Sequence, residues 1–600
     1  MGKAMLGGDR VTVPRAEHPR PDFVREPWIT LNGQWEFAFD DNDKGEKEGW
    51  HSKPLASKIT VPFPFQSPSS GIGDTSPHPI CWYRRSFTLP MSFRGLHVRL
   101  VFGAVDHRAK LWINGTPVAE HEGGYTPFAF DITEHLKRGE NWIALRVEDW
   151  ESPTQARGKQ SREERSRGIF YTRCTGIWQS VWLEGVGEAR IDHLQVLADP
   201  DTGLVRINAW VLGQPVTQEI VATVGLPGGG TVSFRKEITP PAAVGMPAPV
   251  SLEKVISPVR LWSPESPVLY DLKLEIRRGH VTSDRVGTYL AFRSIETRGG
   301  KIWLNGKPIF LRFALDQGYF PRGLYAAETD HQMRRDIELA KLLGFNGARK
   351  HQKVEDPRYL FWADKLGFLL WDEMPSFFEW SQPASQQFAA EWLDVVRRDR
   401  NHPCVIAWVP FNESWGVPRI ADDKEQQAFV ERIYSLTRSE DPTRLVVDNS
   451  GWEHVKTDIA DVHDYTEDAE LFERNWAQFS TQSGAIPAIH RAAFAQGRGY
   501  LGQPVVISEY GGIALSGFEP PEGTKATYYG GLMPNAEEFV KRYKASTKAI
   551  LQHPFLAGFC YTQLYDIEQE VNGLLTFDRK PKVSLAAIAQ INSARAASEK

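Results

Sequence analysis

The spacing of apolar positions divides the chain into a β-rich first half and a second half in which strands and helices alternate. From about residue 27 to residue 292, apolar residues recur at every second position in short runs separated by Gly, Pro, Asn and Asp. This alternation is typical of strands with one buried face and predicts all-β domains. Asn114-Gly115, inside the run LWINGTPV, predicts a tight hairpin because a type I′ turn needs positive φ at both central residues.

Two β-sandwiches fit this first half. The runs up to about residue 187 predict a sandwich of jelly-roll type, and the seven or so runs from Arg190 to Phe292 have the size of an immunoglobulin-like sandwich. Pro240–Pro249 predicts an exposed loop within the second sandwich, and Arg298-Gly299-Gly300 predicts a hinge after it. We therefore expect three domains, at residues 1–188, 189–297 and 298–600.

After Lys301 the pattern changes to apolar strands that alternate with amphipathic helices, such as Thr329–Leu343 and Ala536–Leu551. Eight strands in about 300 residues predict a (β/α)8 barrel. A doubly wound open sheet is the alternative, but the first strand lacks the Gly-rich turn expected there. The predicted strands are Ile309–Ala314, Phe345–Lys350, Phe368–Trp371, Val405–Pro410, Leu445–Asp448, Ile459–His463, Val505–Ser508 and Phe555–Tyr561.

Two glutamates end buried strands of this predicted barrel. The run VIAWVPFNESWG (Val405–Gly416) breaks into a polar turn at Glu413, and PVVISEYGG (Pro504–Gly512) delivers Glu509 three βα units later. Since the carboxyl ends of barrel strands form one face, the two carboxylates are expected to lie opposite each other across its mouth. An exposed, salt-bridged Glu at a strand end is the ordinary alternative for each of them taken singly.

Other strand ends add amides, aromatic rings and charged groups of the kind that bind carbohydrate. We expect Arg349 beside Glu509 and Asn412 on a sugar 2-hydroxyl. Trp408 and Phe411 are expected to form an apolar wall that raises the pKa of Glu413 towards neutrality. The further candidates for substrate contact are Asp316, His351, Trp452, His463, Tyr465 and Gln563.

Composition and charge disfavour several classes of binding partner. The formal net charge of −5 over 600 residues gives no electrostatic footprint for nucleic acid or an anionic membrane, and no apolar run approaches the length of a membrane span. The four cysteines are scattered and form no metal-binding pattern, so we expect no metal and no cofactor. These features and the lack of a signal-like N-terminus favour a cytoplasmic protein that takes a small-molecule glycoside or oligosaccharide; homo-oligomers are compatible with the sequence.

One polar segment interrupts the first sandwich. Ser152–Thr172 is rich in Arg and poor in apolar residues, which favours a solvated loop over a loop that folds towards a substrate site.

Several long motifs, in order, resemble glycoside hydrolase family 2, the family of β-galactosidases, β-glucuronidases and β-mannosidases. They are Val105–Thr133, Thr172–Glu184, Gly299–Arg312, WDE at Trp371–Glu373 and FNES at Phe411–Ser414. The resemblance covers nearly the whole chain. It implies a retaining double displacement with Glu413 as acid/base, Glu509 as nucleophile, and Asn412 and Arg349 beside them, the two carboxyl groups lying about 5 to 5.5 Å apart.

Departures from the family pattern bear on the sugar. Bacterial β-glucuronidases carry Asn-x-Lys where this chain has Glu570-Val571-Asn572, which disfavours a uronic acid. The segments that supply a magnesium ligand and a Ser-His-Tyr motif in large β-galactosidases read ALDQGYF and KHQKV here. We therefore expect an exo-acting retaining β-glycosidase for neutral hexosides, galactosyl-type favoured and including galactofuranosides. The alternatives are a β-glucuronidase, arabinosidase or β-mannosidase, a transglycosylase and, last, a non-catalytic carbohydrate-binding protein.

Overall fold

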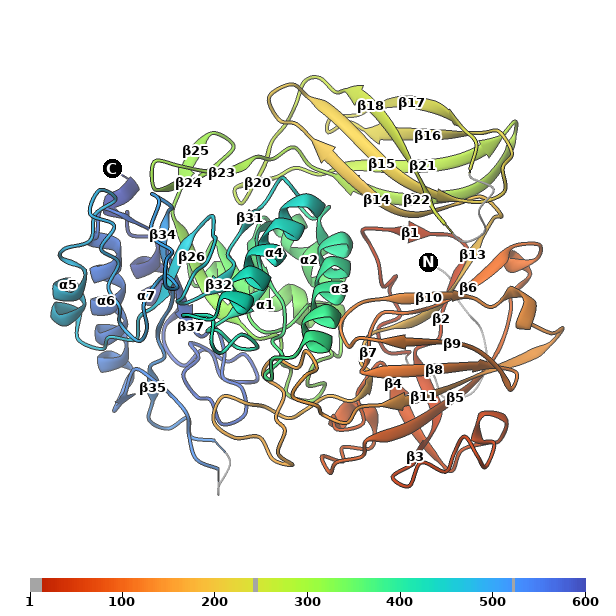
Figure 1. Ribbon diagram of the computed structural model, residues 1–600, viewed down its shortest axis with the longest axis horizontal. Coiled ribbons are helices and arrows are strands. Elements are labelled where there is room, and N and C mark those ends of the chain that lie inside the picture. The colour runs from red at the N-terminus through yellow and green to blue at the C-terminus, as the bar shows by residue number, and fades with distance from the viewer. Residues whose placement is uncertain (1–12, 241–245, 521–523, 600) are drawn as a thin grey trace.

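The computed structural model describes residues 13–240, 246–520 and 524–599 (Figure 1). Two β-sandwiches, coloured red to orange and yellow in Figure 1, lie to one side of a green-to-blue barrel surrounded by helices. The predicted loop at Pro240–Pro249 falls partly on residues 241–245, outside the described residues. None of the described helices is long and apolar enough to cross a membrane.

The N-terminal sandwich packs a six-stranded sheet against a four-stranded one. Its apolar core includes Trp35, Leu100 and Leu111, which come from both sheets. The predicted hairpin at Asn114-Gly115 is confirmed, because these residues have φ of 52° and 84° and join two paired strands. In sheet order the strands are β4 (Ser57–Val61), β3 (Gly33–Phe39), β5 (Ile80–Thr88), β11 (Glu140–Glu148), β8 (Arg108–Ile113) and β9 (Thr116–Glu122), and then β10 (Phe128–Asp131), β6 (His97–Phe102), β13 (Val181–Val186) and β2 (Trp28–Thr30).

The immunoglobulin-like sandwich borrows a short strand from the N-terminal segment. Val24 pairs with Gly287, and Arg25 is buried between Asp284 and Glu184, with 2.9 Å to an oxygen of each. This buried cation ties the two sandwiches together. The sheets are β1 (Val24–Arg25), β22 (Val281–Leu290), β21 (Tyr270–Arg278), β16 (Gln218–Gly225) and β17 (Thr231–Ile238), facing β14 (Arg190–Ala198), β15 (Leu204–Leu212) and β18 (Ala248–Val255).

The predicted hinge at Arg298-Gly299-Gly300 is wrong. Gly299 and Gly300 have φ of 58° and 71° and form the turn between β23 (Ile295–Arg298) and β24 (Lys301–Leu304), which continues to β25 (Lys307–Ile309). The two glycines are needed for positive φ in a tight hairpin. The same sequence signal therefore marks a turn inside a sheet.

The eight predicted barrel strands are confirmed as one parallel sheet. Between the outermost strands, the backbone N–H of Asp458 donates to the carbonyl of Val446 at 2.9 Å, which helps to close the ring. Apolar residues fill these strands because both faces are covered. In sheet order they are β31 (Leu445–Val446), β29 (Val405–Val409), β28 (Leu369–Glu373), β27 (Gly347–Lys350), β26 (Leu311–Asp316), β37 (Leu556–Thr562), β34 (Val505–Gly511) and β33 (Ala460–His463).

The helices cover the outside of the barrel (Figure 1). Thr329 caps the first of them in a capping box with Gln332, and Met333, Ile337 and Ala340 form its buried stripe. The helices are α1 (Asp330–Leu342), α2 (Pro357–Leu366), α3 (Gln382–Asp399), α4 (Lys424–Glu440), α5 (Ala469–Trp476), α6 (Ala536–Gln552) and α7 (Leu585–Asn592).

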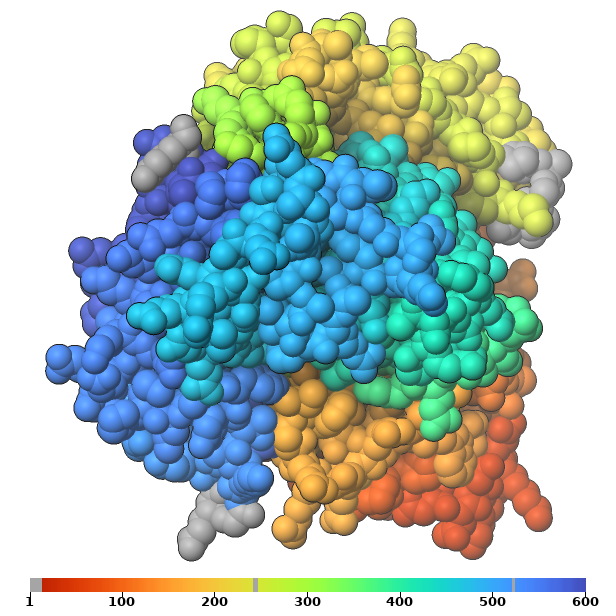
Figure 2. All heavy atoms as spheres, turned by 60° about the vertical axis from the view of Figure 1, so that its left-hand side comes forward, coloured from red at the N-terminus to blue at the C-terminus, as the bar shows by residue number. Residues whose placement is uncertain are grey.

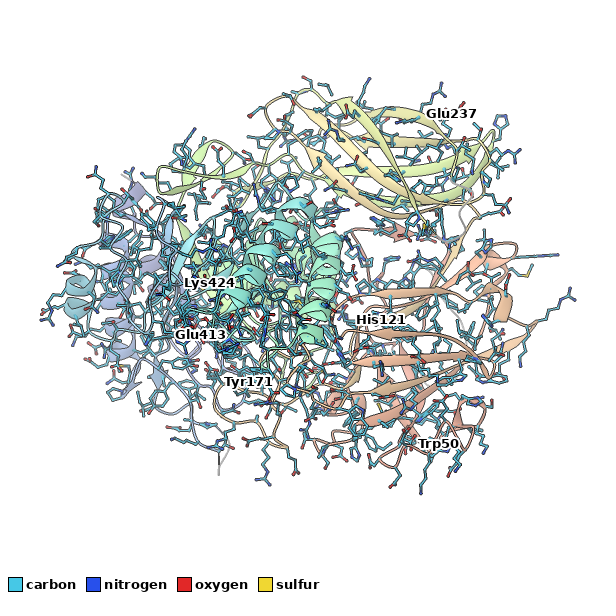
Figure 3. All side chains as sticks on the ribbon, in the orientation of Figure 1. Trp50, His121, Tyr171, Glu237, Glu413 and Lys424 are labelled. Atoms are coloured by element: carbon cyan, nitrogen blue, oxygen red, sulfur yellow. The ribbon has the colours of Figure 1, made fainter. Side chains whose placement is uncertain are left out.

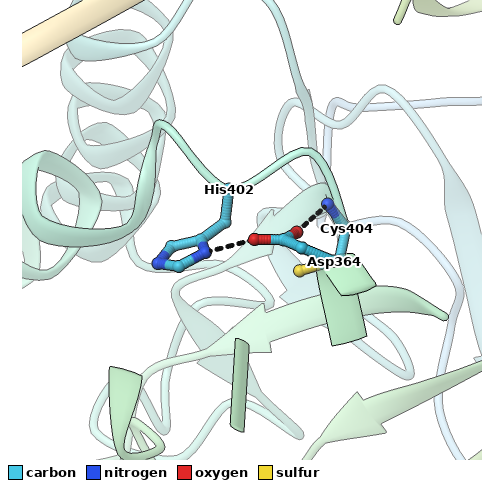
Figure 4. A group of neighbouring side chains, drawn as sticks. All are labelled: Asp364, His402 and Cys404. Atoms are coloured by element: carbon cyan, nitrogen blue, oxygen red, sulfur yellow. Dashed lines mark hydrogen bonds and ion pairs between the residues drawn. The ribbon is translucent and has the colours of Figure 1, made fainter. Parts of the chain in front are cut away.

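A buried polar cluster fastens the immunoglobulin-like domain to the barrel, and Figure 4 shows its barrel members Asp364, His402 and Cys404. The Asp364 carboxylate accepts from the backbone N–H of Cys404 at 2.8 Å and from the Tyr289 hydroxyl at 2.7 Å, and lies 2.6 Å from Nδ1 of His402. Asp364, His402 and Cys404 have the residue types of a metal site. Both carboxylate oxygens already have protein donors, which makes the cluster a hydrogen-bonded joint between domains.

Candidate active site

Glu413 is presented by a tight turn that follows β29 and the short strand β30 (Phe411–Asn412). Glu413 and Ser414 have φ of 53° and 61°, a region that costs non-glycine residues roughly 1–3 kcal/mol and that clusters at functional sites. The turn is held by hydrogen bonds from the Glu413 backbone N–H to the carbonyl of Ser450 at 2.9 Å and from Ser414 Oγ to Glu453 at 2.6 Å. The Glu413 side chain keeps 22% of its surface exposed, so it remains open to solvent.

Glu509, on β34, is held from two sides. Its Oε1 accepts from Arg349 Nη1 at 3.0 Å and its Oε2 accepts from the Tyr465 hydroxyl at 2.6 Å. Burial raises the pKa of Glu509, but His463 and Arg349 outweigh it and leave the pKa below its usual range. Glu509 is therefore an oriented carboxylate that stays ionised.

Arg349, on β27, is the fully buried centre of this network. Its guanidinium also donates to Glu373 at 2.7 Å and to Asn412 Oδ1 at 2.5 Å. Because Arg349 occupies the amide oxygen of Asn412, the Asn412 Nδ2 group is the part left for a ligand, and it makes no hydrogen bond among the described residues.

His463, on β33, connects the two glutamates. The β33–β34 ladder shifts register between Val462 and His463, which places His463 opposite Glu509. Its Nδ1 lies 2.7 Å from Glu413 Oε1 and its Nε2 lies 3.3 Å from Glu509 Oε1. One oxygen of each glutamate and a ring nitrogen of His463 all lie within 4.8 Å of one another.

The prediction that an apolar wall raises the pKa of Glu413 is wrong. Trp408 donates its indole N–H to Asp441 at 2.9 Å, and Phe411 packs against Phe388 with 4.9 Å between ring centroids. Both rings therefore pack away from the carboxylate. Burial itself raises the pKa of Glu413, but the hydrogen bond and charge of His463, with the charges of more distant cations, bring the pKa below its usual value.

Two of the predicted substrate contacts have their polar atoms used within the protein. Asp316 accepts from the Tyr359 hydroxyl at 2.9 Å and pairs with Lys350 Nζ at 2.9 Å, which lowers the pKa of its buried carboxyl to about 2. Gln563 accepts from Gln317 at 2.7 Å and donates to Asn572 at 2.9 Å. These bonds make Asp316 and Gln563 supports of the strand ends, and we withdraw both as sugar contacts.

Three other predicted contacts lie at the barrel mouth. Tyr465 is half-buried against Tyr529, with 4.7 Å between ring centroids. Trp452 stands 5.5 Å from the ring of His463, and its buried indole N–H has no hydrogen-bond partner among the described residues. Burial and Arg349 lower the pKa of His351 well below its usual range, so this imidazole is neutral at physiological pH. Trp452 keeps a free donor for a ligand.

The solvated-loop interpretation of Ser152–Thr172 is wrong for its first half. Residues 155–161 are buried, and the backbone N–H groups of Arg157 and Gly158 donate to the carbonyl of Ser376 at 2.9 and 3.0 Å. Figure 2 shows this orange part of the N-terminal domain against the green and blue barrel, and in Figure 3 Tyr171 and Glu413 lie where the two meet. Composition does not reveal which backbone N–H groups will donate or which single Lys or Tyr will be buried. The sequence therefore pointed to this packing only through the alternative of a loop that folds towards a substrate site.

This loop contributes two residues that the sequence reasoning missed. The Tyr171 hydroxyl donates to Glu570 and accepts from Gln317 at 2.7 Å. Burial raises the pKa of Glu570, and Asn572 donates to it at 3.1 Å. Lys159 Nζ lies 5.1 Å from the ring centroid of Trp415, two residues after Glu413 in sequence. The site is therefore built by two domains.

A cavity of about 620 Å³ adjoins this network. It is lined mainly by hydroxyl and charged side chains from the loop Glu163–Gly168, from Thr524–Thr527 and from Gln569, the residue before Glu570.

The trio Glu413, His463 and Glu509 also has the donor types of a cation site. The guanidinium of Arg349, 3.1 Å from His463 Nε2 and 3.0 Å from Glu509, supplies the positive charge there. A metal ion would meet that charge at contact distance, so the geometry fits acid–base chemistry better than metal binding.

Comparison with known proteins places each domain. Family models match residues 29–185 as "Glycosyl hydrolases family 2, sugar binding domain", residues 189–293 as "Glycosyl hydrolases family 2" and residues 295–594 as "Glycosyl hydrolases family 2, TIM barrel domain". The matches follow the two sandwiches and the barrel described above.

Individual relatives carry two different names. A β-galactosidase of Thermoanaerobacter pseudethanolicus is 29% identical over 349 residues, which are 56% of this chain and 45% of that protein. A β-glucuronidase of Paenibacillus borealis is 25% identical over 533 residues, 82% of this chain and 84% of that protein. This chain thus spans less than half of the first relative and most of the second.

Among solved structures, the β-glucuronidase of Ruminococcus gnavus in complex with D-glucuronic acid shares the fold. It superposes with a TM-score of 0.75 at 20% identity, covering 97% of this chain and 100% of that one. The barrel match alone takes in half of the residues, and the sandwich matches account for most of the rest; the chain belongs to glycoside hydrolase family 2.

Proposed function

We propose that this protein is an exo-acting, retaining β-glycosidase that hydrolyses terminal neutral hexosides, with galactosyl-type sugars favoured. Glu509 is the nucleophile and Glu413 is the acid/base. The observation that carries the proposal is the pairing of an oriented, ionised Glu509 with Glu413, oxygens of the two lying within 4.8 Å. Retaining enzymes hold their carboxyl groups about 5–5.5 Å apart, whereas inverting enzymes need about 6.5–9.5 Å for a water.

In the first step, Glu509 attacks the anomeric carbon while Glu413 protonates the leaving oxygen. Glu413 Oε1 lies 2.7 Å from His463 Nδ1 and its pKa is lowered in the free enzyme, so the first step draws on the minor, protonated form of the Glu413 carboxyl. As Glu509 becomes an ester, its negative charge disappears and so does its repulsion of the Glu413 carboxylate. In the second step, Glu413 therefore acts as base on the attacking water.

Glu570 supports a neutral sugar. Its buried carboxyl group lies within the electrostatic reach of Glu509 and has a raised pKa because burial and that negative neighbour disfavour its charge. A sugar carboxylate would add another negative charge beside this group. The β-galactosidase relative supports the galactosyl preference within the neutral hexosides.

A β-glucuronide is the second candidate substrate. The Paenibacillus borealis relative, which matches over most of both chains, is named as a β-glucuronidase, and the Ruminococcus gnavus enzyme has the same fold. Matched pairs of nitrophenyl β-glucuronides and β-glucosides distinguish a charged from a neutral preference.

Azide rescue tests the two catalytic assignments. On a panel of nitrophenyl pyranosides and furanosides, Glu509→Ala and Glu413→Ala are expected to lose most activity. With azide, Glu413→Ala should form the β-glycosyl azide, because azide attacks the glycosyl-enzyme from the free face. Glu509→Ala should form the α-azide, because azide then replaces the nucleophile.

The control is Glu275→Ala, which removes a buried carboxylate in the immunoglobulin-like domain, away from the barrel mouth. Full activity of Glu509→Ala, or azides of the opposite configuration, would exclude this mechanism.

A further inference from the structure

Lys159 is held in one place by the backbone around it. Its carbonyl accepts from the N–H of Tyr171 at 2.8 Å, and the preceding Gly158 lies against the barrel so closely that a Cβ there would meet the carbonyl oxygen of Gln352 at 2.3 Å. Lys159 itself is 6% exposed. Its long side chain therefore has few directions to take and projects from the N-terminal domain over the barrel.

Three barrel elements locate the ammonium group. Lys159 Nζ lies over the ring of Trp415 and exerts its charge on Glu413, Glu570 and His351, which follow β29, β37 and β27. Groups at three separate strand ends feel the same cation. The ammonium is therefore placed over the barrel mouth, on the side of Glu413 and Glu570.

Lys159 differs from the other buried lysines in the described part of the chain. Lys582 Nζ lies 2.6 Å from Asp566, Lys350 Nζ lies 2.9 Å from Asp316, and Lys353 Nζ lies 2.9 Å from Glu355. Lys159 Nζ makes no hydrogen bond and has no carboxylate within 4.0 Å among the described residues. The Lys159 side chain is buried along its length but its Nζ atom keeps contact with solvent, so the donors of the ammonium are open to a ligand that displaces water.

We infer that Lys159 is a sugar-binding residue that the N-terminal domain contributes to the active site, where its ammonium donates to hydroxyl oxygens of the terminal neutral sugar. This inference rests on the proposed function and deepens it. An ammonium has three donors and no acceptor, and a sugar hydroxyl oxygen is an acceptor that fits it.

A hydroxyl fits better than a sugar carboxylate. Glu413 and Glu570 already place two carboxyl groups within electrostatic range of Lys159. These carboxylates balance the charge of Lys159, but neither of them is close enough to accept a hydrogen bond from its ammonium. A bound sugar that lacks the matching hydroxyl would cover the ammonium without offering it an acceptor, which is the basis of strong discrimination.

The test combines a change in the enzyme with changes in the substrate, as in a double-mutant cycle. Wild type and Lys159→Met are assayed on a nitrophenyl β-glycoside of the neutral sugar that wild type hydrolyses best and on its 2-, 3-, 4- and 6-deoxy analogues. Lys159→Met is expected to lower kcat/KM on the parent about 10- to 150-fold, the range for a hydrogen bond to a charged group. One deoxy analogue should be poor for wild type but suffer no further loss in the variant.

Two variants separate binding from structure. Lys47→Met removes an exposed lysine from the same domain and is expected to leave kcat/KM unchanged. Lys159→Arg keeps a donor and is expected to recover part of the activity.

The pH profile adds an independent readout. Glu413 faces His463, Lys159, Arg349 and Glu509, and removal of the Lys159 charge is expected to raise the pKa of Glu413. The basic limb of kcat/KM should therefore move to higher pH.

Equal losses on the parent and on every deoxy analogue would overturn the hydroxyl contact. A loss confined to β-glucuronides would assign Lys159 to a sugar carboxylate instead. Binding of the parent glycoside to Glu509→Ala, with and without Lys159→Met, measures the contact by calorimetry without turnover. A tenfold or greater loss of affinity there supports the Lys159 contact even if the azide products contradict the catalytic assignments, and an unchanged affinity refutes it.

Discussion

Replacing Arg349 by methionine tests the charge network beneath the two glutamates. The guanidinium is fully buried and donates to Glu373, Glu509 and Asn412 at 2.5 to 3.0 Å. Removing one partner of a buried ion pair costs about 3–5 kcal/mol, and methionine has nearly the same length but no charge. The variant leaves two buried carboxylates without their cation.

The expected change in the pKa of Glu509 follows from the same energy of about 3–5 kcal/mol. Protonation lets a carboxylate avoid the cost of an unpaired charge, and about 3 kcal/mol corresponds to roughly two pKa units. Since Arg349 lowers the pKa of Glu509 in wild type, its removal raises that pKa. As the pH falls, Glu509 then becomes protonated at a higher pH than in wild type. The acidic limb of kcat/KM should therefore move up by about two pH units. Activity below the new limb should fall about 100-fold.

The assay is a pH profile of kcat/KM from pH 4 to 8, together with thermal unfolding. Arg579→Met is the matched control, because Arg579 is a buried arginine bound to Asp336 of α1 at 2.9 and 3.0 Å. Both variants are expected to lose stability, but only Arg349→Met should move the acidic limb. An Arg349→Met enzyme with an unmoved acidic limb and near-normal activity would refute the role assigned to Arg349.

Two further variants examine how the site is held. Tyr465→Phe removes the 2.6 Å hydrogen bond to Glu509 and is expected to lower kcat about 10- to 150-fold with little change in unfolding temperature, as steady-state kinetics and calorimetry would measure; an unchanged kcat would mean that Arg349 alone orients the nucleophile. Gly158→Ala introduces a methyl group at φ of 57° and 2.3 Å from the carbonyl of Gln352. It is expected to displace the loop, to lower kcat/KM at least tenfold and to destabilise the protein by about 1–3 kcal/mol, whereas Gly279→Ala, at a similar φ but in open space, should keep full activity.

The sequence by itself determined the architecture and the proposed catalytic pair. Apolar periodicity separated the sandwiches from the barrel because burial of one strand face, of both strand faces or of a helix stripe each gives a different spacing. Glu413 and Glu509 were identifiable because residues that end parallel strands must meet at one face of a barrel, whatever the loops do. Arg349, His463 and Tyr465 were found by the same rule, and all three contact Glu509.

Tertiary structure alone decided what each of these residues does to its neighbours. The register shift before His463 brings its ring between the glutamates, and the resulting contacts lower the pKa of Glu413 where sequence reasoning expected an increase. A pKa depends on distances to charges and on burial, and neither follows from position along the chain. Asp316 was placed at a strand end as expected, but its partners occupy its oxygens. Lys159 reaches the site from a different domain, through a loop whose polar composition resembles that of an exposed segment and whose packing only the assembled domains determine.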